Sequence, residues 1–262
     1  MKRLLARANV DVLRQFAWSK VLLAFDFDGT LAPIVDDPGD ARMRARTERR
    51  FREVARLYPC VVISGRGQRD LRGRLSGVPV VEVVGNHGID AARYPGALRA
   101  DVRGWTAELA GRLAGLKGVK VEDKQVSLAI HYRQSRAKRH AAQEIERAIA
   151  SLSGVRVIRG KLVFNLLPEG APHKGLALLS ARARFGCDTA IYVGDDASDE
   201  DVFALDEPGR LLGVRVEESA SSHASYFLGD QAEIDPMLDV LLACRAASGG
   251  ARDASPMVSG AA

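Results

Sequence analysis

The sequence predicts an α/β fold: a Rossmann-like parallel sheet with helices on both faces, and a smaller α+β domain inserted after the third core strand. Near both ends of the 262-residue chain, short apolar runs alternate with amphipathic helical segments, which is typical of a parallel sheet. The run 21–25 is apolar at every position, as expected for a strand buried on both faces. In the middle of the chain, two strands follow each of two helices, which indicates a separate small domain.

The core is predicted to consist of residues 1–96 and 173–246, beginning with an amphipathic helix that reaches Trp18. Its first part should contain strands at 21–26, 60–64 and 80–84, helices at about 42–57 and 67–75, and a short outer strand at 89–94. Its second part should contain helices at 174–185, 199–205 and 235–245, and strands at 189–193, 211–215 and 226–228. The segment 247–262 is small and polar, and we expect it to form a disordered tail.

The inserted domain is predicted at 97–172. Apolar residues at helical spacing predict helices at 102–113 and 137–150. Alternating residues predict one hairpin from 119–122 and 126–132, and a second from 155–158 and 162–166. Two linkers at one edge of the core suggest that this domain is a cap that closes over a site on the core and excludes water.

Two carboxylates mark the end of the first core strand. Asp26 and Asp28 follow the apolar run, and Gly29 ends the strand. Because side chains alternate along a strand, both acids point to one side, at the edge where open α/β sheets bind ligands. Like charges so placed repel unless a cation lies between them, and carboxylate oxygens suit Mg²⁺. A turn or helix-cap role explains one aspartate before a glycine but not the pair.

Two further segments offer groups for a phosphate. Ser64 should stand at the end of the second core strand, where its hydroxyl and the amides of Gly65 and Arg66 could donate to phosphate oxygens. Lys174 opens a helix, where a cation opposes the helix dipole, and such a local misfit often marks function. An ordinary Ser-Gly turn and a solvated surface lysine are the alternative interpretations.

The strand predicted at 189–193 ends in a glycine and a run of acids: Asp195, Asp196, Asp199, Glu200 and Asp201. An acidic run is usually a solvated face, but this one continues directly from a core strand and opens a helix. A divalent cation would relieve the repulsion among these carboxylates. Asp199 and Glu200 would also suit a helix N-terminus, so not every acid need touch a metal.

Together these segments give the chain a resemblance to the haloacid dehalogenase (HAD) superfamily of phosphatases. That superfamily's motifs occur here in order, at Asp26-Phe27-Asp28-Gly29-Thr30-Leu31, Ser64, Lys174 and Gly194-Asp195-Asp196. More closely, the chain resembles the trehalose-6-phosphate phosphatase family at 26–34, Ser64-Gly65-Arg66, Gly85-Asn86-His87-Gly88 and 194–203. The resemblance extends over roughly residues 20–243.

The resemblance implies a Mg²⁺-dependent phosphomonoesterase that works through an aspartyl-phosphate. Asp26 would be the nucleophile, and Asp28 the acid that protonates the leaving sugar oxygen and then the base that activates water. Ser64 and Lys174 would bind the transferring phosphoryl group. Mg²⁺ would be held by the Asp26 carboxylate, the Asp28 backbone carbonyl and Asp195, with Asp196 and Asp199 either supporting these ligands from outside or binding the metal occasionally.

The cap is expected to select the sugar, because similar core chemistry serves many substrates. The candidate substrate contacts are Ser64, Gly65, Arg66, Asn86, His87, Arg133, Lys161, Asn165, Glu169 and Lys174. A satisfied turn histidine and solvated hairpin charges are the alternative interpretations of His87, Arg133 and Lys161. The family typically has a Glu on the final cap strand followed closely by Arg-Pro, where this chain has Asn165-Leu166-Leu167-Pro168. An Asn hydrogen-bonds a sugar hydroxyl more weakly than a carboxylate does.

Three functions therefore agree with the sequence. The first is hydrolysis of trehalose 6-phosphate to trehalose and phosphate. The second keeps the chemistry but acts on another glycoside phosphate, such as that of glucosylglycerol, glucosylglycerate or sucrose. The third is a non-catalytic regulatory HAD module. The presence of the expected residue at every catalytic position argues against it.

The resemblance implies a small-molecule sugar phosphate as the partner, and the charge and cysteine content indicate no other class of partner. The net charge is +5, but the basic residues are spread out and lack an aromatic stacking platform, so no nucleic acid is expected. No apolar stretch is long enough to cross a bilayer, and no secretory signal is evident, so no membrane is expected. The three cysteines show neither metal-site nor disulfide spacing, which indicates a reducing compartment, and we expect a cytoplasmic protein. A monomer is the working expectation.

Overall fold

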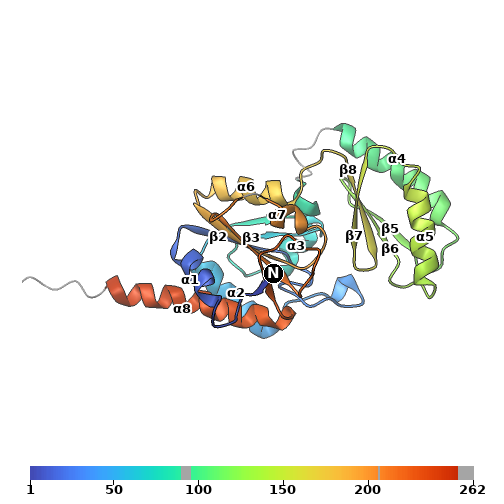
Figure 1. Cartoon of the computed structure of the whole chain (residues 1–262). Helices are drawn as coiled ribbons and strands as arrows, with labels where there is room; N and C mark the ends of the chain where they lie inside the picture. Colours follow the sequence, from blue (N-terminus) through green and yellow to red (C-terminus); the bar gives the residue numbers. More distant parts are fainter. Residues whose placement is uncertain (90–95, 206, 253–262) are drawn as a thin grey trace, which may run out of the picture.

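The computed structural model describes residues 1–89, 96–205 and 207–252, which form a layered core and a smaller domain beside it (Figure 1). The core sheet is parallel and seven-stranded, in the order β1-β11-β10-β9-β2-β3-β4. Its strands are β1 (Lys2–Arg3), β2 (Val21–Phe25), β3 (Cys60–Ile63), β4 (Glu82–Val84), β9 (Thr189–Gly194), β10 (Leu211–Val216) and β11 (Tyr226–Leu228). Because β2 lies between β9 and β3, the three strands that carry the sequence motifs are neighbours.

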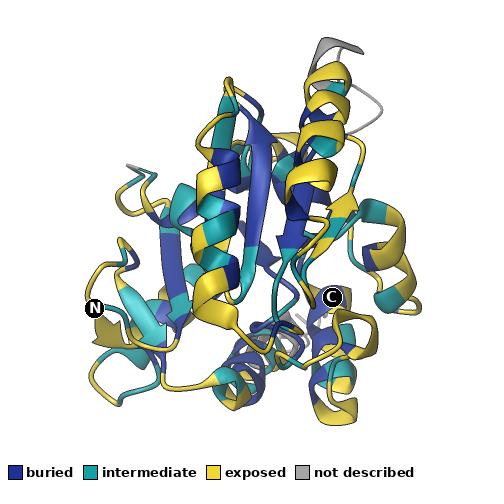
Figure 2. Cartoon of the chain, turned by 90° about the vertical axis from the view of Figure 1, so that its right-hand side faces the viewer, coloured by how far each residue is buried: buried dark blue, intermediate teal, exposed yellow. Residues whose placement is uncertain are grey.

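Helices cover both faces of this sheet because its central strands are apolar throughout; β2 is buried at every position. One face is covered by α1 (Val10–Trp18), α2 (Ala45–Leu57), α3 (Gln68–Arg74) and α8 (Ile234–Arg252). The other face is covered by α6 (Lys174–Arg184) and α7 (Glu200–Phe203). Figure 2 shows this layering as buried strands between helices whose outer faces are exposed. The carboxyl edge of the sheet is left for loops, and the site is built there.

The smaller domain is an antiparallel sheet in the order β5-β6-β8-β7, with two helices packed on it. Its elements are α4 (Gly96–Leu113), β5 (Lys120–Asp123), β6 (Leu128–His131), α5 (Lys138–Ile149), β7 (Val155–Gly160) and β8 (Val163–Pro168). Phe164 and Leu166 on β8 pack against the helices. Asn165 alternates with them and therefore lies on the other face of the sheet, which looks toward the core.

The predicted strand and helix order is confirmed in both parts of the chain, with local differences. β1 was not predicted, because Lys2 and Arg3 carry no apolar pattern and form a strand only by pairing with β11. α4 begins at Gly96, before the predicted start at 102. α8 continues to Arg252, past the predicted end at 245 and into the expected tail. Apart from Ile89, the strand expected at 89–94 lies outside the described residues, as does 253–262. Within the described residues, no helix is long and apolar enough to span a membrane.

Candidate active site

Polar side chains from separate loops meet at the carboxyl ends of β2, β3 and β9. Asp26 and Asp28 follow β2, Ser64 follows β3, and Asp195 follows β9, while Lys174 begins α6. They lie at the floor of a cleft of about 640 Å³ whose other side is the cap sheet. The site is therefore at the edge of the sheet that the sequence predicted.

Lys174 is the buried cation of this site, with only 1% of its side chain exposed. Its Nζ donates to Asp199 Oδ1 at 2.7 Å and lies 3.3 Å from Asp26 Oδ1. Burial opposes the charge on Lys174, but the carboxylates of Asp199 and Asp26 outweigh burial and raise its pKa. The ammonium is thus retained and held against Asp26.

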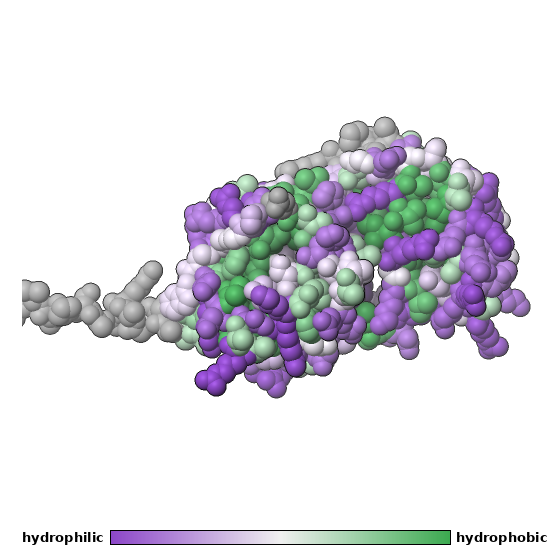
Figure 3. All heavy atoms as spheres, viewed as in Figure 1, coloured by the Kyte–Doolittle hydropathy of each residue, from purple (hydrophilic) through white to green (hydrophobic). Residues whose placement is uncertain are grey.

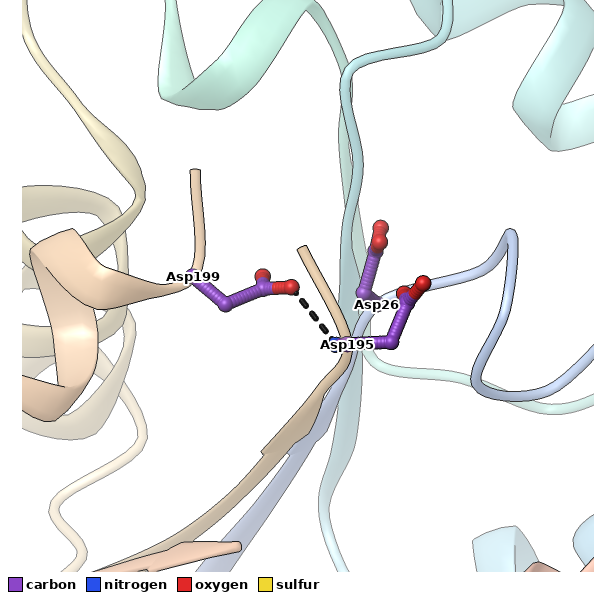
Figure 4. A group of neighbouring side chains, drawn as sticks. All are labelled: Asp26, Asp195 and Asp199. Carbon is purple, nitrogen blue, oxygen red and sulfur yellow. Dashed lines mark hydrogen bonds between the residues drawn. The ribbon is translucent and has the colours of Figure 1, made fainter. Parts of the chain in front are cut away.

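Asp199 anchors the acidic loop. Its Oδ1 accepts from Lys174 Nζ and from the Tyr192 hydroxyl at 2.5 Å. Its Oδ2 accepts from the backbone amides of Asp195 at 2.8 Å, drawn in Figure 4, and of Asp196 at 2.9 Å. A carboxylate has about four lone-pair sites, and these four donors use them all. Asp199 therefore positions the loop and the lysine, and its oxygens also belong to the group of carboxylates that could hold a metal.

Asp26 and Asp195 are better placed to hold a cation. Oxygens of Asp26, Asp195 and Asp199 lie within 4.8 Å of one another (Figure 4). Asp26 Oδ1 makes no hydrogen bond within the described part of the chain, and Asp195 Oδ1 accepts a long bond of 3.4 Å from the Thr30 hydroxyl. Burial raises the pKa of both carboxyls well above its usual value, and neighbouring carboxylates add to the rise. A divalent cation would relieve this repulsion, so these donors fit one.

Gly29 allows the two acids to approach. Its φ is +78°, and a Cβ atom there would lie 2.0 Å from Asp195 Oδ2. Any larger residue would push Asp195 away from Asp26, so this turn requires glycine for space as well as for conformation.

Asp196 shapes the same loop. Its Oδ1 accepts from the Ser198 amide at 2.7 Å and from the Ser198 hydroxyl at 2.6 Å. Burial would raise the pKa of Asp196, but Lys174 and these two hydrogen bonds outweigh burial and lower it. The remaining oxygen faces the tip of the β7–β8 hairpin near Gly160.

The cap side of the cleft is lined by polar residues of one sheet face: Lys120, Glu122, Lys124, His131, Arg133, Lys161 and Asn165. Lys120, Glu122, Lys124 and His131 were not among the predicted contacts. The register shows why they join the site: Glu122 pairs with Ala129, which pairs with Asn165, so all three share a face. Alternation along 120–124 could have suggested them, but only with the strand pairing known. The carboxylate of Glu122 accepts from His131, which lowers its pKa.

His87 reaches the cleft from the core. Its ring is buried against Gly65, where a Cβ atom would lie 2.5 Å from His87 Cε1. Neither ring nitrogen has a hydrogen-bond partner among the described residues. Burial lowers the pKa of His87 to about 3, and the ammonium groups of Lys174 and Lys124 act in the same direction. A neutral imidazole therefore faces the cleft, with one donor and one acceptor to offer.

The other predicted contacts divide into two groups. Ser64, Gly65, Arg133, Lys161 and Asn165 line the cleft. Asn86 and Glu169 do not: Asn86, which precedes His87 in the chain, is buried, and Glu169 is exposed beyond the end of β8. Arg66 lines the cleft but turns to Asp28, with which it forms a bidentate ion pair.

Three basic side chains tie the cap to the core, each to a different loop of the site. Lys124 Nζ donates to the Gly65 carbonyl at 3.0 Å, and burial lowers the pKa of Lys124. Arg133 Nη1 donates to the Val35 carbonyl at 2.6 Å. Arg156 on β7 pairs with Asp201 on α7. The cap is thus closed onto the loops that follow β2, β3 and β9.

The parallel sheet, the loops at its carboxyl edge and the α+β cap together define the HAD-type fold. The chain belongs to the trehalose-phosphatase family, whose model matches residues 24–231. It is 34% identical over 209 residues to the trehalose-phosphate phosphatase of Mycobacterium avium. That match covers 73% of this chain and 53% of the relative, so the chain spans about half the relative's length.

Solved structures agree on the fold. The C-terminal domain of Candida albicans trehalose-6-phosphate phosphatase superposes with a TM-score of 0.72 at 21% identity, covering 90% of this chain and 97% of that domain. The C-terminal domain of a C. albicans trehalose synthase regulatory protein superposes with a TM-score of 0.68 at 12% identity, covering 88% and 97%. Since both proteins share the fold, the function depends on the site.

Proposed function

We propose that this chain hydrolyses trehalose 6-phosphate to trehalose and phosphate, with Mg²⁺ as cofactor. The observation that carries the proposal is the contact of the Lys174 ammonium with Asp26, beside Asp195 and at the floor of the cleft. The Asp26 carboxylate lies beside the charged ammonium of Lys174 and, together with Asp195, offers oxygens suited to one metal ion. A carboxylate in such surroundings is suited to attack a phosphoryl group. Membership of the trehalose-phosphatase family and the name of the M. avium relative support the substrate.

In the first step an Asp26 oxygen attacks phosphorus and the bond from phosphorus to the sugar oxygen breaks. Asp28 gives its proton to that oxygen, and an aspartyl-phosphate remains. In the second step Asp28 takes a proton from a water that attacks phosphorus, and the bond to Asp26 breaks. Ser64 and Lys174 hold the phosphoryl oxygens in both steps. The Asp26 carboxylate, the Asp28 carbonyl and Asp195 would hold Mg²⁺, which supplies positive charge to the phosphoryl oxygens.

We propose that residues 97–172 act as the cap and residues 1–96 and 173–246 as the catalytic core. The cap face and His87 would then hold the sugar. His87 and Asn165 suit hydroxyl groups because both are neutral and each can donate and accept. Lys124 and Glu122 lie on the same cap face and could complete a polar surface around the sugar.

A second candidate substrate is another glycoside phosphate. It is favoured by Asn165 and Leu167, which replace the charged residues that the family typically has on this strand. Leu167 packs in an apolar cluster with Ile158 and Val126, so this position of the strand carries no charge. Across the sheet, Leu167 pairs in register with Arg156, which is engaged by Asp201.

We further propose that the protein works in a reducing compartment such as the cytoplasm, as one chain. Cys60 and Cys187 are free and buried, which suits a reducing environment.

The test is phosphate release from a panel of esters, with and without Mg²⁺. The panel contains trehalose 6-phosphate, sucrose 6-phosphate, the phosphates of glucosylglycerol and glucosylglycerate, and an aryl phosphate. The highest kcat/KM on trehalose 6-phosphate is the expected result. A higher value on another glycoside phosphate would favour the second candidate. Failure to cleave any ester would instead indicate a regulatory module.

A further inference from the structure

The Asp28 carboxylate is held by a guanidinium fork. Arg66 Nε donates to Asp28 Oδ2 and Arg66 Nη2 donates to Asp28 Oδ1, both at 2.6 Å. The Arg66 side chain is 11% exposed, whereas that of Asp28 is 37% exposed and borders the cleft. A planar fork on both oxygens fixes the plane of a carboxylate as well as its position.

Arg66 is itself held from behind. Its Nη1 donates to Asp70 on α3 at 2.9 Å, and its Nη2 also donates to the Pro38 carbonyl at 2.8 Å. Arg74, one turn further along α3, donates to the same Asp70 at 2.9 Å. The guanidinium lies over the Phe27 ring, 5.6 Å from its centroid. The chain Arg74–Asp70–Arg66–Asp28 therefore fixes Asp28 to a helix rather than to a mobile side chain.

These contacts leave Arg66 little to offer a substrate. A guanidinium has five N–H donors. The hydrogen bonds of Arg66 to Asp28, Asp70 and the Pro38 carbonyl use four of them. The Asp28 carboxylate, by contrast, has about four lone-pair sites, and the fork uses one on each oxygen. A site therefore remains for the proton that Asp28 gives to the leaving oxygen or takes from a water. Arg66 is thus placed to act through Asp28.

We propose that Arg66 is a positioning residue that orients Asp28 for proton transfer to the leaving sugar oxygen, with Asp70 holding Arg66 in place. This inference rests on the proposed phosphatase function and adds a role to it. It replaces the expectation that Arg66 contacts the sugar. Its specific consequence is that Arg66 matters in proportion to how much the leaving group needs a proton.

The test compares two esters by kcat/KM, which covers the steps up to the aspartyl-phosphate and so isolates the departure of the leaving group. A sugar alkoxide needs a proton as it leaves, whereas a nitrophenolate does not. In Arg66→Gln we expect kcat/KM on trehalose 6-phosphate, or on whichever glycoside phosphate the wild type cleaves fastest, to fall about 100-fold, the size of a general-acid contribution. On p-nitrophenyl phosphate the fall should stay within about fivefold.

Three variants sharpen the test. Arg66→Lys keeps the charge but not the fork, so it should restore only part of the loss. Asp70→Asn should show the same leaving-group dependence as Arg66→Gln, with a smaller fall. Arg72→Gln, an exposed position on the same helix, is the control and should behave as wild type. Thermal unfolding of each variant reports its folding.

The outcomes separate this inference from the function on which it rests. Equal losses on both esters in Arg66→Gln would overturn it and indicate a structural role or, if KM rises for both, contact with phosphate. Wild-type activity on both esters in the variant would overturn it as well. If the wild type cleaves neither ester, the proposed function fails and the inference fails with it.

Discussion

The floor and the roof of the cleft are built on different principles. On the floor, the charged groups are paired: the buried Lys174 contacts Asp26 and Asp199, and the partly exposed Asp28 is held by Arg66. On the roof, Lys120, Lys124, Arg133 and Lys161 face one carboxylate, Glu122. The floor has one arrangement because each buried charge requires its partner. The roof consists of residues on three strands, β5, β6 and β8, and in the adjoining turns, and it can change residue by residue. On the proposed function, the comparison assigns the reaction to the floor and the choice of sugar to the roof.

The surface of the molecule shows no such division. In Figure 3 hydrophilic residues are spread over the visible faces of both the core and the cap, with apolar residues between them. Between the two helices, Arg46 and Arg50 of α2 form ion pairs with Asp235 and Asp239 of α8. Part of the basic charge is therefore neutralised within the fold.

The largest effect should come from the floor, in Asp26→Asn. The amide cannot form the aspartyl-phosphate, so turnover on every ester should fall at least about 1,000-fold, which corresponds to about 4 kcal/mol in the barrier. Phosphate release with trehalose 6-phosphate and with an aryl ester measures this loss. Residual turnover above about a hundredth of wild type would contradict the assignment of the nucleophile.

The next pair of variants separates two acids of the floor. Asp195→Asn should raise the Mg²⁺ concentration for half-maximal activity at least about tenfold. It should not lower the melting temperature of the metal-free protein, because it removes one of several carboxylates that repel one another. Asp199→Asn should lower that melting temperature, because breaking a buried ion pair costs about 3–5 kcal/mol. Chelator-treated protein, melted and then titrated with Mg²⁺, gives both quantities. A larger loss of Mg²⁺ affinity in Asp199→Asn would show that Asp199 is the ligand.

Changing the roof should affect one substrate and spare another. Asn165→Ala removes a polar group from the sugar side, so kcat/KM on trehalose 6-phosphate should fall about tenfold, as expected for the loss of one or two hydrogen bonds. Hydrolysis of an aryl phosphate should stay within about twofold, because that ester carries no sugar. Arg139→Ala on the exposed face of α5 is the matched control. Equal losses on both esters would place Asn165 in the folding of the cap rather than in recognition.

The last prediction concerns the pH dependence of stability rather than activity. The pKa of His87 is lowered to about 3 in the folded protein, so the unfolded chain binds a proton there below about pH 6.5 and the folded one does not. Stability should therefore fall as the pH drops from about 6.5 toward 3. His87→Asn keeps a residue that tolerates the left-handed backbone and should flatten this fall by up to about 1.4 kcal/mol per pH unit. Urea unfolding at several pH values measures the slopes, and parallel curves would show that His87 does not titrate as proposed.

The sequence predicted the floor better than the roof, for a physical reason. Asp26, Asp28 and Lys174 stand where a strand ends or a helix begins, and such places can be recognised from a short stretch of chain. Lys124 and Glu122 become neighbours of Asn165 only through the register of three strands, which the sequence does not contain in any one stretch.

Two side chains of the floor have partners within the protein that the sequence did not reveal. Asp199 was expected to support the metal site or bind the metal occasionally, and in the structure it also accepts hydrogen bonds from Tyr192 and two backbone amides, which meet it only in the folded loop. Arg66 was expected at the sugar, but Asp28 and Asp70 compete for it at short range. In both cases a charged group found its partner within the protein, and sequence alone does not rank such partners.

The close packing of Gly65 on the His87 ring ties together two loops that follow different strands. Position 65 can accept a side chain only if position 87 gives up its ring, and a smaller residue at 87 leaves a hollow that position 65 could fill. Among relatives with other sugar preferences, these two positions should therefore vary as a pair. Directed evolution of new specificity should randomise the two positions together, because a single replacement at position 65 would clash with the His87 ring.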